Sequence, residues 1–307
     1  MPTGKAGKVL NKTVAIVVTY NRCELLRECI NALRNSVIAV DVLVVDNAST
    51  DGTEEMLKAY PADSGVRYHR MEKNTGGAGG FSFGLKKAYG EGYDYFWLMD
   101  DDTMIYPDSL EKLMEAGKKL EDGYGFLSGL ALWTDGTECT MNYHAIAADW
   151  NMEKKKLEEG ILKVEAATFV SFFTRREVIA SVGLPIKEYF IWGDDTEFTR
   201  RISRCYPCYL AVHSRVIHKM ASNQASGDIA DNIDTERIDR MFYSVRNDCC
   251  THRRMGWKNF LRYTINTIHM LVHVLMRARQ FKGRKAKVII KGYFAGVMFR
   301  PGIEMVR

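Results

Sequence analysis

Short apolar runs alternate with polar segments along the first hundred residues. The runs at 14–18 and 40–45 are continuous and mostly β-branched, and a shorter run stands at 66–70, so each has the length and composition of a strand. A helix is predicted over about 24–33, between the first two runs. Strand and helix alternation at this spacing predicts right-handed βαβ crossovers and a parallel sheet.

A fourth apolar run, at 93–99, is the stretch around which the chain is organised. Its large apolar residues are too few for a helix but sufficient for a buried strand, and they lead directly into three aspartates at 100–102. The acids are therefore expected at the carboxyl end of a strand, where open α/β sheets bind ligands. Polar segments at 19–22, 46–47 and 74–80 follow the earlier strands, so one crevice is predicted at this edge.

The three adjacent carboxylates repel one another, and placing them beside a buried strand is costly unless a positive charge neutralises them. In extended backbone Asp100 and Asp102 point the same way and Asp101 points the opposite way, so the first and third can approach one ion. Oxygen ligands suit hard cations such as Mg²⁺ or Mn²⁺. The alternative is a solvated acidic turn that also caps a helix predicted over 107–120.

Glycine fills four of the five positions from Gly76 to Gly80. The segment is predicted to be a loop before a helix at about 81–89, whose first amides would favour an anion. Its spacing matches neither the dinucleotide fingerprint nor the Walker motif, and a flexible linker is the other interpretation. In the loop after the second strand, Ser49 or Asp51 is expected to cap the helix that follows.

The second half of the chain has a different pattern, in which strands and turns are mixed. Strands are predicted at 124–132 and 167–174, a turn at 134–136, and a helix over 175–181. The second half is therefore predicted to lack the regular strand and helix alternation of the first.

A second acidic motif follows an aromatic segment at 189–192. Asp194 and Asp195 are expected at the amino end of a helix beside an apolar wall, although a plain helix cap with Glu197 completing a capping box explains the same residues. A lone histidine, His218, follows further along, and a lone histidine is more often structural than a ligand. Its role depends on the residues that surround it.

The composition is that of an ordinary globular protein, with 46% hydrophobic and 26% charged residues in 307. This length can bury one large core or two modest ones. Seven cysteines, an odd number scattered along the chain, argue against a disulfide framework and favour a reducing cytoplasm. The polar, basic start precedes a run of only about six apolar residues, so no secretory signal is expected.

The positive charge is concentrated at the carboxyl-terminal end. Twelve Lys and Arg and no Asp or Glu lie between Cys249 and Ile303, so the other residues carry −7 while the whole chain carries +5. An amphipathic helix is predicted over 260–276, but its uncharged part is too short to span a bilayer. Peripheral contact with an anionic membrane is predicted, with a helical lid or an oligomer contact as alternatives. Nucleic-acid binding is not expected, because no recognised module accompanies the charge.

Four features in combination resemble the inverting family-two glycosyltransferases with a GT-A fold, over about residues 12–250. They are the polar strand ends at 19–22 and 45–53, the glycine-rich segment, the Asp-x-Asp at 100–102, and the aromatic-flanked Asp-Asp-x-Glu at 194–197. Residues 74–81, the triple aspartate, residues 192–195 and residues 243–247 resemble the galactofuranosyltransferase branch. Rhamnosyltransferases are near relatives of that branch.

The resemblance implies a role for each matched residue. Asp100 and Asp102 would ligate Mn²⁺ or Mg²⁺ with His218 as third ligand, and Asp195 would be the catalytic base with Asp194 as a second acid. Gly193 separates the tryptophan from the acid pair, unlike the branch pattern, so the choice of base between the two aspartates stays open. The residues predicted to bind the nucleotide sugar are Thr19, Asn21, Arg22, Asp46, Asn47, Asn74, Gly76, Gly77, Asp101 and Trp192.

The expected architecture is an α/β protein with a GT-A, Rossmann-like mixed sheet and a helical extension. The chain is predicted to consist of a polar segment at 1–12, a catalytic domain at 13–239 and a basic helical extension at 240–307. The expected activity is metal-dependent, inverting transfer of galactofuranose from UDP-galactofuranose to a glycan or lipid-linked acceptor. The alternatives are a rhamnosyltransferase that uses dTDP-rhamnose, a catalytically idle nucleotide-sugar-binding protein, and a membrane-bound scaffold. We expect a cytoplasmic protein that lies peripherally on the inner face of the membrane and that can form a homo-oligomer.

Overall fold

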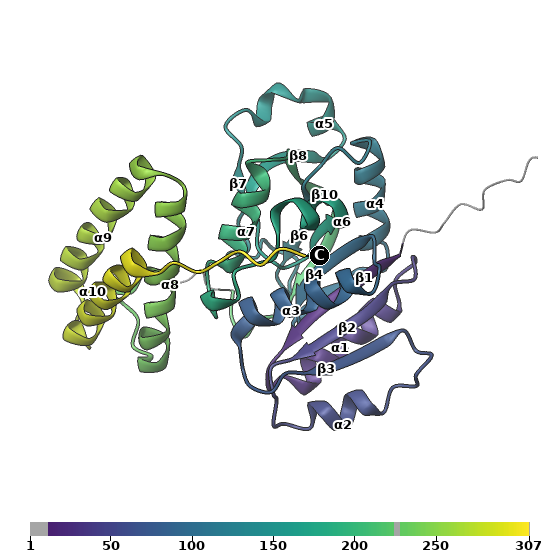
Figure 1. Cartoon of the computed structure of the whole chain (residues 1–307), viewed down its shortest axis with the longest axis horizontal. Helices are drawn as coiled ribbons and strands as arrows, with labels where there is room; N and C mark the ends of the chain where they lie inside the picture. Colours follow the sequence, from purple (N-terminus) through teal and green to yellow (C-terminus); the bar gives the residue numbers. More distant parts are fainter. Residues whose placement is uncertain (1–11, 224–227, 307) are drawn as a thin grey trace, which may run out of the picture.

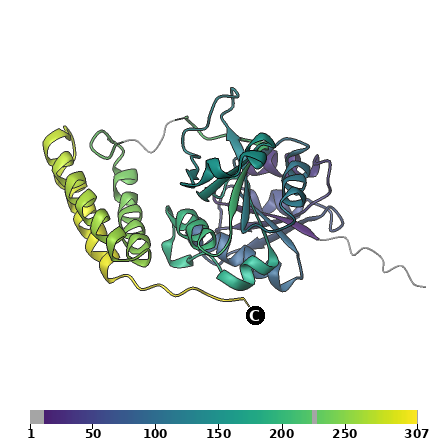
Figure 2. The same ribbon diagram turned by 90° about the horizontal axis from the view of Figure 1, so that it is seen from above.

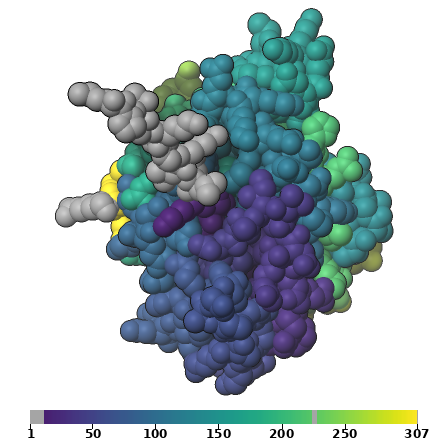
Figure 3. Space-filling model, turned by 90° about the vertical axis from the view of Figure 1, so that its right-hand side faces the viewer, coloured from purple at the N-terminus to yellow at the C-terminus, as the bar shows by residue number. Residues whose placement is uncertain are grey.

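The computed structural model describes residues 12–223 and 228–306, which form a sheet domain with a layer of long helices beside it (Figure 1). The predicted polar segment at 1–12 lies outside the described residues except for Lys12. In the space-filling view from the side away from the helical layer, the amino-terminal strand and helix units form the lower half of the surface (Figure 3).

Within the described residues, ten strands form one mixed sheet in the order β3-β2-β1-β4-β9-β6-β10-β8-β7, with β5 paired to β10. Strands β1 to β4 are mutually parallel, β9 is antiparallel to both β4 and β6, and β10 is parallel to β6. Strand β10 therefore ends at the same edge as β1, β2 and β4. The bounds are β1 Thr13–Thr19, β2 Asp41–Asp46, β3 Val66–Arg70, β4 Tyr95–Asp100, β5 Thr103–Ile105, β6 Phe126–Leu132, β7 Ala145–Ile146, β8 Ile161–Ala166, β9 Phe172–Arg175 and β10 Cys208–His218.

Helices cover both faces of the sheet, because alternate residues of its apolar strands point to opposite sides. Ala15 and Val17 of β1 pack into the core under α1, α2 and α4, whereas Val14 and Ile16 pack into the core under α3, α6 and α7. The bounds are α1 Cys23–Arg34, α2 Thr53–Lys58, α3 Gly76–Gly90, α4 Ser109–Lys119, α5 Lys154–Glu158, α6 Arg176–Val182 and α7 Asp194–Ser203. The predicted α/β sheet architecture is confirmed.

The predicted glycine loop is wrong, because α3 begins at Gly76 and contains all four glycines. Close packing of this helix on the sheet explains them. A Cβ on Gly80 would lie 2.6 Å from Val18 Cγ1, and one on Gly84 would lie 2.5 Å from Ile16 Cγ2. Both distances are far below normal contact, so these glycines allow the helix to approach β1.

Two predicted helix caps differ from the structure in position. Helix α2 has Gly52 as its N-cap, but the Asp51 carboxylate accepts hydrogen bonds from Thr53 N and Oγ1 at the start of α2, at 3.3 and 2.6 Å, and from Cys23 N at the start of α1. Helix α7 has Gly193 as its N-cap, so Glu197 lies one position too late for a capping box and pairs with Arg201 on the same helix. In both cases a glycine with positive φ turns the chain into the helix.

Other differences concern strand bounds. Strand β8 was not predicted, and the strand predicted at 167–174 is replaced by the shorter β9. Strand β8 pairs with β10 near the end of the sheet, and its Lys and Glu interrupt the apolar run that would have identified it.

The helical layer consists of α8 Thr235–Arg254, α9 Trp257–Arg277 and α10 Lys282–Met298. Helix α8 lies nearest the sheet domain, and α9 and α10 lie on its far side (Figures 1 and 2). The predicted boundary at 239/240 falls inside α8. Gly292 and Gly296 let α10 approach α8, since a Cβ on either would come within 2.8 Å of an α8 side chain. Among the described helices, none combines the length and hydropathy needed to cross a bilayer.

Candidate active site

Four strand ends meet at one edge of the sheet, and the predicted site residues gather there. The edge is formed by the carboxyl ends of β1, β2 and β4 and by the end of β10, which brings His218 to the aspartates after β4. The antiparallel pairing of β10 with β5 places His218 opposite Thr103, more than one hundred residues away in the sequence. The strand ends that were predicted to lie together do share this edge of the sheet.

Asp100, Asp102 and His218 each bring one ligand atom to within 4.8 Å of the others. Asp102 and His218 are buried, and Asp102 Oδ1 lies 3.0 Å from His218 Nε2. That contact lacks hydrogen-bond geometry, and Asp102 Oδ1 has no hydrogen-bond partner among the described residues. A buried carboxylate oxygen without a donor is an atom that a cation can satisfy. The three residues therefore fit a divalent cation.

The orientation of His218 is set by a residue that the sequence did not reveal. His218 Nδ1 lies 2.6 Å from Asn142 Oδ1, which can only accept, while Asn142 Nδ2 donates to Thr168 Oγ1 at 2.8 Å. A proton is thus held at Nδ1, and Nε2 is the ring atom that faces the aspartates. This is the arrangement in which a neighbouring group prepares a histidine to ligate a metal.

Asp101 points away from this cluster toward the end of β1. Thr19 Oγ1 donates to Asp101 Oδ2 at 2.7 Å, and Arg22 Nη1 lies 3.2 Å from Asp101 Oδ1 and 2.7 Å from Asp102 Oδ2. Burial and the charge of Asp102 raise the pKa of Asp100 to about 7, and burial raises that of Asp101 to about 6 despite Arg22. Burial also opposes ionisation of Asp102, but His218 and Arg22 keep its pKa below the usual range.

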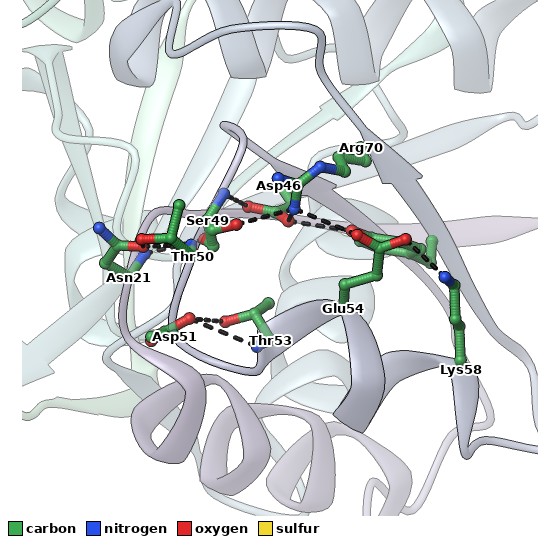
Figure 4. Close-up of polar contacts among 10 residues, drawn as sticks. Asn21, Asp46, Ser49, Thr50, Asp51, Thr53, Glu54, Lys58 and Arg70 are labelled. Carbon is green, nitrogen blue, oxygen red and sulfur yellow. Dashed lines mark hydrogen bonds and ion pairs between the residues drawn. The ribbon is translucent and has the colours of Figure 1, made fainter.

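Asn21 and Asp46, the candidate nucleoside residues after β1 and at the end of β2, belong to one network of polar contacts (Figure 4). Asp46 is fully buried, and its Oδ1 accepts a hydrogen bond from Ser49 N at 2.8 Å. Its Oδ2 accepts one from a tyrosine hydroxyl on β3 at 3.0 Å and lies 3.4 Å from Arg70 Nη1. Asn21 Oδ1 accepts from Thr50 N at 2.7 Å, which joins the two loops. Asp46 and Asn21 therefore hold the shape of this corner.

Asn47 and Asn74 act on the start of α3. Asn47 is buried, its Oδ1 accepts from Thr75 N and Oγ1 at 3.1 and 2.9 Å, and its Nδ2 donates to the Gly76 carbonyl at 3.1 Å. Asn74 Oδ1 accepts from Gly76 N at 2.8 Å. In this structure the two side chains anchor the first turn of α3 to the end of β2.

The first turn of α3 in turn contacts the loop that carries the second acidic motif. Gly76 has a φ of +70°, and a Cβ on it would lie 1.9 Å from the Phe190 carbonyl oxygen. The same carbonyl accepts a hydrogen bond from Ala78 N at 3.2 Å. Gly77, beside it, faces open space, since no atom lies within 4 Å of the place of a Cβ. Gly76 is therefore required by a close backbone contact, whereas the space at Gly77 does not require a glycine.

The loop before α7 has a strained backbone. Phe190 and Trp192 have φ values of +66° and +64°, and Gly193 follows with +83°. Positive φ is unfavourable for large side chains, so such residues persist where the surrounding structure holds them, most often at functional sites. The strained turn delivers the acid pair at the amino end of α7.

Asp194 and Asp195 have different surroundings. Asp194 is buried, and burial together with the charges of Asp195 and Asp100 raises its pKa well above the usual range. Burial also raises the pKa of Asp195, but hydrogen bonds from Thr196 N and Oγ1 favour its charged form. Of the two acids, Asp195 is the one that these contacts favour as an anion.

Helix α8 supplies the support for this loop, and sequence reasoning assigned it no role. Asn247 is fully buried and donates from Nδ2 to the carbonyls of Tyr189, Ile191 and Trp192 at 2.9, 3.1 and 2.7 Å. The next residue, Asp248, lies beside Gly193, and burial raises its pKa to about 6. The motif at 243–247 was the available signal, but its hydrogen-bond partners are more than fifty residues away.

Comparison with known proteins agrees with this geometry. The family model for glycosyl transferase family 2 matches residues 14–179. The chain is 24% identical over 255 residues to the galactofuranosyltransferase GlfT1 of Mycolicibacterium smegmatis, covering 76% of this chain and 80% of that protein. It is 40% identical over 110 residues to an undecaprenyl-phosphate mannosyltransferase of Micrococcus luteus, covering 34% of this chain and 44% of that protein.

The fold also has a counterpart among solved structures. The crystal structure of GalNAc-T7 with UDP, GalNAc and Mn²⁺ is similar with a TM-score of 0.63 and 16% identity, over 95% of this chain and 56% of that one. At this identity the likeness concerns the fold, which is the GT-A arrangement of a mixed sheet between helices. The expected fold class is therefore confirmed.

Proposed function

The chain belongs to glycosyl transferase family 2, and from that premise we propose that it is a metal-dependent, inverting galactofuranosyltransferase that uses UDP-galactofuranose. One observation carries the proposal: the Asp100, Asp102 and His218 cluster and the Asp194 and Asp195 pair converge on the same edge of the sheet. The similarity to GlfT1 over most of the chain supports the choice of donor sugar. The mannosyltransferase relative supports the transferase class with a different sugar.

In this proposal Asp100, Asp102 and His218 hold Mn²⁺ or Mg²⁺. When bound, a divalent cation there neutralises the charge of the donor diphosphate. The chain contributes Arg22 as a second positive group, half exposed beside the same carboxylates. The nucleoside is proposed to bind at the ends of β1 and β2, beside Thr19, Asn21, Asp46 and Asn47. Asp101 holds Thr19 and Arg22 in place.

The donor sugar is proposed to lie between the first turn of α3 and the strained loop before α7. Gly77 offers an open surface there, and Gly76, Asn74 and Trp192 form the two sides. The strain at Trp192 supports a functional reason for this loop.

The transfer step is proposed to be a single displacement. The acceptor oxygen forms a bond to the anomeric carbon of the sugar while the bond from that carbon to the diphosphate oxygen breaks, and the electron pair of that bond leaves with UDP. A carboxylate oxygen of Asp195 takes the acceptor hydroxyl proton. Asp194 is proposed as the second acid, because burial and the nearby carboxylates of Asp195 and Asp100 raise its pKa.

A glycan or lipid-linked acceptor is proposed, and the similarity to an undecaprenyl-phosphate mannosyltransferase supports it. A cytoplasmic enzyme at the inner face of the membrane would meet such an acceptor. A second candidate function is rhamnosyl transfer from dTDP-rhamnose, which the same site chemistry supports.

A donor panel tests the proposal. The protein is incubated with UDP-galactofuranose, UDP-galactopyranose, dTDP-rhamnose and GDP-mannose with Mn²⁺ or Mg²⁺, and nucleotide release and sugar transfer are measured by mass spectrometry. The parent protein is expected to turn over UDP-galactofuranose. The Asp195→Asn variant is expected to show no turnover. Preference for dTDP-rhamnose supports the second candidate, and nucleotide binding without turnover of any donor contradicts both.

A further inference from the structure

An apolar stripe runs along the outer face of α9. Its members are spaced three or four residues apart, so they lie on one side of the helix. The opposite side carries Tyr263, Thr267 and Val274, which are buried against the neighbouring helices. The stripe consists of Trp257, Leu261, Ile265, Ile268, Val272, Leu275 and Met276, whose exposed fractions range from 46% to 81%.

Helix α10 continues this surface. Ile290, Phe294 and Met298 are exposed and spaced four residues apart, while Gly292 and Gly296 on the other side pack against α8. Helices α9 and α10 contact each other, and both lie on the side of α8 away from the sheet domain (Figure 2). We call the stripe on α9 together with these three α10 side chains the outer apolar face.

Positive charge surrounds the outer apolar face. Lys258 and Arg262 lie beside the α9 stripe, and Lys287 and Lys291 lie beside the α10 residues, all four of them exposed. Within the part of the chain that the structure describes, none of these four is in an ion pair with a carboxylate. The segment from 249 to 303 contains no acidic residue that could neutralise them.

We propose that the outer apolar face binds the surface of an anionic lipid bilayer. An apolar stripe flanked by lysine and arginine is the pattern of a helix that lies in the interface of a membrane. A second copy of this chain would oppose the same cationic residues to each other, and it offers no acidic residues from this segment, so charge disfavours it as the occupant. Anionic headgroups complement both properties of the face.

The placement of the active site agrees with this surface. Asn247 on α8 contacts the loop that carries the acid pair, so the active site lies on the inner side of the helical layer. Binding through the outer face places the bilayer against the side of the helical layer away from the acid pair, so the proposed lipid contact does not cover the site. This last point rests on the proposed function, whereas the lipid contact itself does not.

Vesicle flotation of the full-length protein tests the proposal without nucleotide or donor. Vesicles of phosphatidylglycerol and phosphatidylcholine are compared with phosphatidylcholine alone. The protein is expected to float with the anionic vesicles only. Lys287→Gln/Lys291→Gln is expected to reduce partition by about thirty-fold, since each basic residue near an anionic surface contributes roughly a factor of five.

Matched variants separate charge from insertion. Ile265→Ser/Phe294→Ser is expected to reduce flotation at least ten-fold, and the effect should persist at 0.5 M salt relative to the parent. Lys154→Gln/Lys155→Gln and Val37→Ser/Met152→Ser, which remove equivalent exposed groups from the sheet domain, are expected to float like the parent protein.

The outcomes are distinguishable from failure of the proposed function. Absence of flotation, or equal flotation of all variants, overturns the lipid assignment even if donor turnover in solution is normal. A concentration-dependent dimer in light scattering that Ile265→Ser/Phe294→Ser abolishes, without flotation, assigns the face to a second copy instead. Flotation without turnover of any donor supports the lipid contact and contradicts only the proposed function.

Discussion

The Asn247 side chain on α8 donates a hydrogen bond of 2.7 Å to the carbonyl of Trp192, two residues before Asp194. The same amide reaches two more carbonyls of that loop, and Asn247 is fully buried. The helical layer therefore does more than cover the sheet domain. It holds the strained turn from which the proposed catalytic acids project.

Asn247→Asp is expected to lower kcat by about a hundred-fold, because the new side chain cannot donate to the three carbonyls and a shift of about 1 Å in the acid pair is enough for such a loss. The KM for the donor and the affinity for UDP should change less than three-fold. Asn259→Asp on α9, which removes a similar amide to carbonyl contact, is the matched control. An unchanged kcat in folded Asn247→Asp contradicts the positioning role.

Asn142→Ala is expected to weaken Mn²⁺ binding by about ten- to a hundred-fold, because His218 loses the acceptor that keeps its proton at Nδ1. Asn142→Asp retains an acceptor at the same place and should bind Mn²⁺ nearly as well as the parent. Calorimetric titration with Mn²⁺ alone measures both variants. Equal affinities for parent and Asn142→Ala would show that His218 does not depend on this contact.

Gly76→Ala is expected to destabilise the protein by about 2 kcal/mol or more, since it combines positive φ with a clash against the Phe190 carbonyl. Gly77→Ala is the control, because open space surrounds that position and alanine is the better helix former by up to about 1 kcal/mol. Urea denaturation measures both free energies of unfolding. Equal values would mean that the first turn of α3 is not fixed as described.

The sequence was sufficient for the strands that lead into the site. β1, β2 and β4 are buried on both faces, so their continuous apolar runs identified them, and their common direction placed Thr19, Asp46 and Asp100 at one edge. Gly80 was misread as part of a loop, because this glycine is required by the contact of α3 with β1 and not by a local turn. Local pattern alone does not contain such contacts.

The long-range hydrogen bonds that position the site residues could not be predicted from the sequence either. Asn142 and His218 are 76 residues apart, and nothing near Asn142 identifies it as the partner of a candidate ligand. Asn247 stood in a noticed motif, but its role depends on where α8 packs. Pairwise tertiary contacts of this kind require the folded chain.

Stability is expected to fall between pH 6.5 and 4 because of His144. Burial lowers the pKa of His144 to about 4, with its Nε2 2.9 Å from Ser128 Oγ. The unfolded chain takes up this proton first as the pH falls, so the folded state loses up to about 3 kcal/mol across that window and nothing above it. The free energy of unfolding against pH measures this loss.

His144→Gln should remove that part of the pH dependence and leave stability at pH 8 within about 1 kcal/mol of the parent. His213→Gln, at an exposed position on β10, serves as the matched control. If the free energies of unfolding of the parent and of His144→Gln change in parallel from pH 8 to 4, His144 is excluded as the source of the pH dependence.

The central claim is that the cluster after β4 binds the ion that neutralises the donor diphosphate, facing the acid pair. Anomalous diffraction from a crystal soaked with Mn²⁺ and UDP measures the ion position directly. The account predicts a peak bound by Asp100, Asp102 and His218 and in contact with the diphosphate. A Mn²⁺ peak and UDP bound away from these three side chains would contradict it.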